Sequence, residues 1–156
     1  MNKKKILLVL YLIFFNIAFG SEQREVKIGL GYKGRSYDPH KHTDSSTLAI
    51  TKQIYNNLFY LDKNINIQPE LAESYIFDKN NNLVIKLKKG ILFHDETELN
   101  ADIVIKSLKR NLSIPVTKVL VEPIESIEKI DNYTILIKQK FNSQLVLHNL
   151  THSSLA

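Results

Sequence analysis

Histidine is the first residue type to consider for chemistry, because imidazole binds metal ions and transfers protons near neutral pH. The chain has five histidines, and His40 and His42 stand two apart, which would place both rings on one side of an extended segment. Two imidazoles could face a cation, but no carboxylate or third histidine stands at helical spacing to complete a ligand set. We therefore expect both to be solvated loop residues and predict no metal site. His94 precedes two acids, and we interpret His94-Asp95-Glu96 as a turn before a helix capped by Asn100.

Nucleophiles offer no better catalytic candidate. No serine lies in a glycine elbow, and no Gly-x-Gly-x-x-Gly run follows a predicted strand. The absence of cysteine also excludes a disulfide framework, a thiolate zinc site, a cysteine nucleophile and a lipid anchor on an N-terminal cysteine. The sequence thus predicts neither an enzyme nor a bound cofactor.

Net charge argues against nucleic acid as a partner. The 21 Lys and Arg outnumber the 16 Asp and Glu, but three of the lysines lie within the first 20 residues, which hold no acid. Without that segment the balance is 18 against 16, or +2. This excess is spread along the chain, whereas nucleic-acid binding needs a clustered basic stripe.

The first 20 residues have the three-part layout of a secretory signal peptide. Three lysines precede an apolar run from Ile6 to Phe15, and Ala18 and Gly20 stand before polar Ser21. Even the 14 residues from 6 to 19 are fewer than the roughly 20 that cross a bilayer. We expect cleavage after Gly20 and a periplasmic product without a stable membrane anchor.

Hydrophobic spacing predicts a mixed α/β (α+β) fold. Alternating apolar residues predict a strand over 25–32, and Asp44 or Ser45 is expected to cap a helix that runs to Leu58. From Phe59 the apolar period is two, and turn residues at 62–64, 78–82 and 88–90 predict an antiparallel meander. Its clearest strand places three apolar residues inward: Leu83, Ile85 and Leu87.

The second half of the chain is predicted to contain two further helices and two strands. After Asn100, a stripe of apolar residues predicts a helix that Pro115 ends; the stripe comprises Ala101, Val104, Leu108 and Leu112. We interpret 121–130 as a strand that turns at 131–132 into an alternating strand over 133–137. A last helix starts near 142 or 143, and we expect its apolar face, Val146 and Leu150, to remain uncovered.

Several short segments occur in an order that characterises a known family. They are Tyr37-Asp38-Pro39-His40-Lys41, Gln53-Ile54-Tyr55-Asn56-Asn57-Leu58, Pro69-Glu70-Leu71-Ala72-Glu73-Ser74, Leu87-Lys88-Lys89-Gly90-Ile91-Leu92-Phe93-His94-Asp95, Asn100-Ala101-Asp102-Ile103-Val104 and Ser107-Leu108-Lys109-Arg110. Together they resemble the N-terminal part of the extracellular solute-binding proteins of peptide ABC importers, the oligopeptide- and dipeptide-binding family. The resemblance runs from about Val26 to Leu150. It departs from the family at Glu96 and Glu98, where glycine and proline are usual.

The resemblance implies the first part of a two-lobe periplasmic-binding-protein-like fold. It implies a signal peptide over 1–20, the start of the first lobe over 21–58, a small antiparallel β subdomain with a helix at 101–112 over 59–138, and a return toward the first lobe over 139–156. The family clamps a peptide between two lobes, and its second lobe comes from sequence beyond Ala156. We therefore expect an incomplete, truncated chain.

The resemblance also implies a function in transport. We expect the substrate-binding component of a peptide importer, with a peptide ligand and an inner-membrane ABC permease as partners. Thr43, Asp44 and Ser45 match family positions that touch the ligand backbone, although helix capping explains Asp44 and Ser45 equally well. Two alternatives stay open: a different cargo such as a nickel chelate or haem, or an inactive fragment without binding function.

Overall fold

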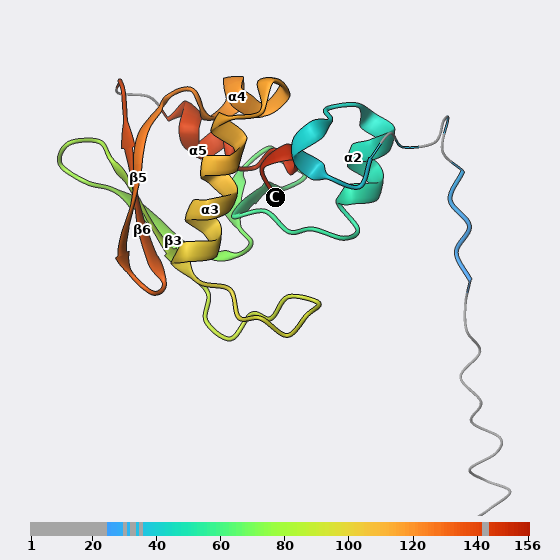
Figure 1. Cartoon of the computed structure of the whole chain (residues 1–156), viewed down its shortest axis with the longest axis horizontal. Coiled ribbons are helices and arrows are strands. Elements are labelled where there is room, and N and C mark those ends of the chain that lie inside the picture. Colours follow the sequence, from blue (N-terminus) through green and yellow to red (C-terminus); the bar gives the residue numbers. More distant parts are fainter. Residues whose placement is uncertain (1–24, 30, 32–33, 35, 142–143) are drawn as a thin grey trace, which may run out of the picture. The chain divides into compact units, whose positions relative to one another are not determined.

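The computed structural model of the chain describes residues 25–29, 31, 34, 36–141 and 144–156, and combines helices with two antiparallel sheets (Figure 1). Residues 31–156 form one compact unit. The mixed helix and sheet content predicted from the sequence is confirmed. The predicted signal peptide lies outside the described residues.

The strand predicted over 25–32 is wrong for the residues that the structure describes. Residues 25–29 have no regular secondary structure, and Val26 and Ile28 are 79% and 75% exposed. An alternating pattern stabilises a strand only when a neighbouring strand accepts its backbone hydrogen bonds. Neither of the two sheets provides such a neighbour for this segment.

The first helices follow a loop shaped by proline. Asp38 is extended (φ −83°, ψ 110°), as its position before Pro39 predicts, and its side chain accepts a hydrogen bond from the His40 amide at the start of the short 3-10 helix η1 (Pro39–Lys41). Helix α2 (Ser45–Thr51) is capped by Asp44, which accepts from the Thr47 amide at 2.9 Å.

Helix α2 ends earlier than predicted, at Thr51 rather than Leu58. The amide of Asn57 donates to the Glu70 carboxylate at 2.8 Å, and its side-chain amide donates to the carbonyl of His152 at 2.7 Å. These long-range bonds satisfy Asn57 outside a helix, and side chains of this type favour such alternatives.

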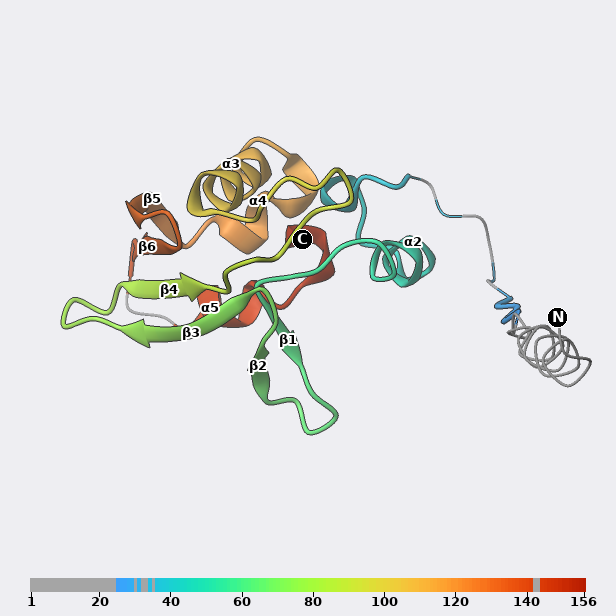
Figure 2. The same ribbon diagram turned by 90° about the horizontal axis from the view of Figure 1, so that it is seen from below.

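The meander predicted from Phe59 is confirmed, but it is divided between two sheets. Strands β1 (Phe59–Leu61) and β2 (Ile67–Pro69) form a separate hairpin that points away from the larger sheet (Figure 2). The larger sheet has the order β3-β4-β6-β5, built from β3 (Ala72–Phe77), β4 (Leu83–Leu87), β5 (Ile124–Asp131) and β6 (Thr134–Gln139). All neighbouring strands in it are antiparallel.

The turns of the two first hairpins use the same five-residue pattern, Asp-Lys-Asn-x-Asn, at 62–66 and 78–82. In each, the leading aspartate accepts hydrogen bonds from the third and fifth amides at 2.8–2.9 Å. The fourth residue has a positive φ in both turns, 64° at Ile65 and 59° at Asn81. Asparagine tolerates this left-handed conformation, whereas a β-branched side chain is strained in it.

The core lies between the larger sheet and helix α3 (Ala101–Leu112). Leu83, Ile85 and Leu87 are fully buried, as the alternation predicts. Asn100 caps α3 by accepting from the Ile103 amide at 3.1 Å, also as predicted. The predicted stripe is wrong at its last position, because Leu112 is 37% exposed while Asn111 is fully buried.

Pro115 was expected only to end the preceding helix, but it also begins α4 (Pro115–Val121). The first turn of a helix needs no intrahelical N–H donor, so proline is well tolerated there. The strand expected over 121–130 consequently starts later, at Ile124, since Val121 closes α4.

The final helix, α5 (Leu145–Asn149), is followed by the 3-10 helix η2 (Ser153–Leu155). Contrary to expectation, its apolar face is covered: Val146 and Leu150 are 1% and 2% exposed and belong to the core. The packing of α5 against α4, a helix that the sequence pattern did not reveal, explains the difference.

Candidate functional site

A charged cluster links the loop before α2 to helix α3. The guanidinium of Arg110 donates to both carboxylate oxygens of Asp38, at 2.9 and 2.5 Å, and its Nη1 also donates to Nδ1 of His40 at 2.8 Å. We call Asp38, His40 and Arg110 the clasp. His40, expected to be a solvated loop residue, is only 3% exposed, so that prediction is wrong.

The clasp fixes the protonation states of its members. Arginine only donates, so Nδ1 of His40 must accept, and the hydrogen resides on Nε2, which lies 3.0 Å from the backbone oxygen of Ala156. Burial, assisted by the positive charge of Arg110, lowers the pKa of His40 despite the opposing effect of the Ala156 oxygen and Asp38. The hydrogen bond from Arg110 lowers the pKa of Asp38 from 3.8 to about 2.

The clasp does not have the arrangement of a catalytic triad. Ser107 Oγ lies 3.4 Å from Nε2 of His40, but that nitrogen carries the hydrogen and cannot take a proton from the hydroxyl. The carboxylate of Asp38 is paired with Arg110 and the loop backbone rather than with Nδ1 of His40. The geometry therefore suits a structural connection and lacks the base that hydroxyl activation requires.

Sequence reasoning missed the clasp, although a signal for it was present. Its residues lie in two of the segments that carry the family resemblance, 37–41 and 107–110. The segments are about seventy positions apart, and only the fold shows that they touch.

The other histidine motif is a turn, as predicted. Asp95 accepts from the Thr97 amide at 3.1 Å, and Glu96 has a φ of 66°, the left-handed region that favours the glycine usual in the family. Glu98 accepts from the Gly90 amide at 3.0 Å and from the Tyr133 hydroxyl at 2.8 Å. No group of three or more His, Cys, Asp or Glu able to hold a metal ion occurs within the described part of the chain.

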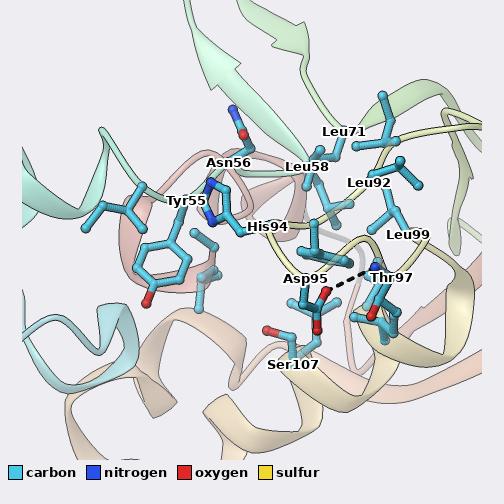
Figure 3. A pocket seen from close by; sticks show the side chains of 18 residues that line it. Tyr55, Asn56, Leu58, Leu71, Leu92, His94, Asp95, Thr97, Leu99 and Ser107 are labelled. Carbon is cyan, nitrogen blue, oxygen red and sulfur yellow. Dashed lines mark hydrogen bonds between the residues drawn. The ribbon is translucent and has the colours of Figure 1, made fainter.

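An open, largely apolar pocket of about 570 Å³ lies beside this turn (Figure 3). Residues from the stretches 54–58 and 91–99, one side of α3 and the last two residues of the chain line it, with Tyr55, His94 and Asp95 among its polar side chains. Leu92 and Phe93 remain 61% and 43% exposed. Such a surface can receive an apolar side chain or another polypeptide segment.

A second depression, the α2–α5 groove, has a volume of about 640 Å³. It is lined by Ser45 and Leu48 of α2, by Lys52 directly after α2, and from the end of the chain by His148, Thr151 and His152, among others.

The three residues predicted to contact ligand have different surroundings in the structure. Ser45 is exposed and lines the α2–α5 groove, Thr43 is exposed two residues earlier, and Asp44 between them caps α2. None of the three lines the apolar pocket.

A model of the family described as bacterial extracellular solute-binding proteins, family 5, middle part, matches residues 66–156. The chain belongs to this family, whose members are binding proteins of transport systems and not enzymes. The resemblance inferred from the short segments is thereby confirmed.

Three relatives illustrate the similarity. The glutathione-binding protein GsiB of Escherichia coli O1:K1 / APEC is 33% identical over 138 residues, covering 85% of this chain and 27% of its own. The oligopeptide-binding protein AppA of Bacillus subtilis, solved with a nonapeptide, superposes with a TM-score of 0.68 at 30% identity over 74% of this chain and 24% of its own. NikA of Staphylococcus aureus, solved with Ni(L-His)2, superposes with a TM-score of 0.61 at 24% identity. The match covers 65% of this chain and 22% of NikA.

The chain thus spans about a quarter of the length of the curated relatives it matches (27%). Among the described residues, no helix combines the length and apolar character needed to cross a bilayer.

Proposed function

We propose that this chain is the N-terminal part of the substrate-binding component of a peptide ABC importer. Such a component captures oligopeptides or dipeptides outside the inner membrane and delivers them to a permease. The observation that carries the proposal is the 30% identity and TM-score of 0.68 with a protein solved with a bound nonapeptide. The 33% identity with a glutathione-binding protein supports the same cargo class, because glutathione is itself a peptide.

Another cargo is the second candidate. The similarity to NikA, at 24% identity, reflects a shared fold, and a scaffold of one fold serves different ligands. A nickel chelate or haem is therefore the alternative cargo. The remaining alternative is a chain without binding function.

We further propose that Thr43, Asp44 and Ser45 contact the peptide backbone. The exposure of Thr43, just before the α2 cap, and of Ser45, the first residue of α2, supports this role. Asp44 has the competing task of capping α2. Its replacement would therefore affect stability as well as binding, and Ser45→Ala is the cleaner substitution.

The proposed contacts are too few for tight binding by this chain alone. Each hydrogen bond contributes about 0.5–1.5 kcal/mol net, so two or three give on the order of 1–4 kcal/mol. Immobilising a peptide costs at least ~4 kcal/mol. We expect calorimetry with a mixed peptide pool to show no micromolar affinity.

Weak contacts can be located by NMR. We expect millimolar trialanine to shift the backbone amide signals of residues 43–45, and Ser45→Ala to reduce these shifts, while Ni(L-His)2 leaves them in place. A response to Ni(L-His)2 alone would favour the alternative cargo. If neither compound moved these signals, their role as ligand contacts would be rejected.

The proposed location is the periplasm, reached through a signal peptide cleaved after Gly20. The family's description as extracellular supports export. The mature product would then act as an unanchored protein beside an inner-membrane permease.

A further inference from the structure

The α2–α5 groove differs from the rest of the surface in its charge. Most of its lining comes from two segments that contain no acid, residues 45–58 and 142–156, and Leu61 and Leu120 complete it. The remaining parts of the chain hold all 16 Asp and Glu. None of the residues that line the groove is acidic.

Three basic or titratable side chains line this groove: Lys52 from the end of α2, and His148 and His152 from the end of the chain. The two histidines are four residues apart, on either side of the end of α5. Ser45 and Thr151 add hydroxyl groups. Acids stand close in sequence to three of the lining residues: Asp44, which caps α2, precedes Ser45, Asp62, which holds the first hairpin turn, follows Leu61, and Glu122 lies two residues after Leu120.

The ring of His152 is held in one orientation. Its Nδ1 accepts a hydrogen bond from the Ser154 amide at 3.2 Å, and its backbone carbonyl accepts from the Asn57 side chain at 2.7 Å. In the neutral ring, Nε2 must then carry the hydrogen, so it is a donor in either protonation state.

Lys52 and His152 also interact electrostatically. Burial and the positive charge of Lys52 both lower the pKa of His152. The positive charge of Lys52 repels the protonated form of the His152 ring, and a bound anion would counter this effect.

We propose that the α2–α5 groove binds the carboxylate group of a ligand, with Lys52 as the charge partner and Nε2–H of His152, together with the Ser45 hydroxyl, as hydrogen-bond donors. The inference rests on the proposed function, because it names the part of a peptide-like cargo that this wall would hold. The leucines on the groove walls, Leu48 and Leu61, would contact the apolar part of the same ligand.

The test follows the histidine ring signals of the full chain by NMR across pH, at constant ionic strength. Succinate is the probe and succinamide its neutral control. We expect succinate, but not succinamide, to raise the pKa of His152 by about half a unit or more. The exposed His94 lies outside the groove and acts as an internal reference.

Two variants make the test specific. Lys52→Gln should abolish the succinate response of His152, whereas Lys63→Gln, an equal loss of charge at the exposed tip of the first hairpin, should preserve it. Equal responses of His94 and His152, a response that survives Lys52→Gln, or no response at all would each overturn the proposal.

Trialanine and its C-terminal amide then identify the source of the carboxylate. A response to trialanine but not to the amide assigns the groove to the peptide C-terminus. A response to succinate without any response to trialanine keeps the anion site but contradicts peptide as its ligand. Shifts at residues 43–45 with an unchanged His152 would preserve the proposed function and reject the carboxylate site.

Discussion

Arg110→Met is the substitution that tests the clasp most directly, because it removes three hydrogen bonds and keeps the aliphatic bulk of the side chain. The fall in the pKa of Asp38 from 3.8 to about 2 corresponds to at most about 2.4 kcal/mol. Solvent screens this pair, since the Arg110 and Asp38 side chains are 45% and 23% exposed. We therefore expect about 1–2 kcal/mol from the ion pair.

The imidazole adds a second contribution. Without Arg110, the buried Nδ1 of His40 loses its donor, which costs about 1 kcal/mol. We expect Arg110→Met to lower the free energy of unfolding by about 2–3 kcal/mol at pH 7, measured by urea denaturation followed by circular dichroism. Lys109→Met, at an exposed neighbouring position, is the matched control and should change stability by less than about 0.5 kcal/mol.

The pH dependence provides the decisive measurement. The Asp38 carboxylate stabilises the folded chain above the unfolded pKa of 3.8, and this stabilisation is lost as pH falls from 3.8 toward 2. His40 has a lowered pKa in the folded chain, so protonation of the unfolded state destabilises the wild type below about pH 6.5. The positive charge of Arg110 helps to lower the pKa of His40, so this destabilisation at low pH is smaller in the variant.

The difference between wild type and Arg110→Met should therefore shrink at pH 3. A loss below about 0.5 kcal/mol at pH 7, or an equal loss at both pH values, would refute the account of the clasp.

The remaining predictions concern the leader, two local structures and the distribution of stability. Mass spectrometry of exported material should show a mature N-terminus at Ser21, and an intact Met1 terminus in a membrane fraction would contradict the periplasmic location. Ile65→Asn should stabilise the chain by about 0.5–1 kcal/mol in thermal denaturation, because asparagine occupies the equivalent left-handed position in the second turn without strain; a destabilised variant would show that Ile65 has a compensating contact. Asn100→Ala should cost about 1 kcal/mol in the same assay through loss of the α3 cap, with Asn64→Ala, whose side chain makes no cap, as a milder comparison. Limited proteolysis should leave residues 59–138 intact longest. Preferential survival of 21–58 would contradict our proposal that 59–138 is the stable subdomain.

Features that depend on neighbouring residues were predictable from the sequence. The caps at Asp44 and Asn100 act within three residues, and the alternation of Leu83, Ile85 and Leu87 needs only a sheet with one buried face. Periodicity and capping describe such local requirements, so the elements that they predict are largely those observed.

Features that depend on distant partners were not predictable. His40 looks like a polar loop residue until Arg110 and Ala156 are brought against it. Pro115 ends one helix and starts another, and a pattern based on helix breakers recognises only the first role. The length of α2 was overestimated because Asn57 bonds to Glu70 and His152.

The position of β6 between β4 and β5 has a consequence for the kinetics of folding. Each outer pair, β3–β4 and β5–β6, is a local hairpin, whereas the β4–β6 seam joins residues such as Leu83 and Ile137 that lie far apart in the sequence. Hairpins close within microseconds, but the seam must wait until the intervening helices α3 and α4 have shortened the connection between its strands. We therefore expect the rate of folding to be set by the docking of two preformed hairpins, with the β4–β6 seam absent from the earliest intermediates.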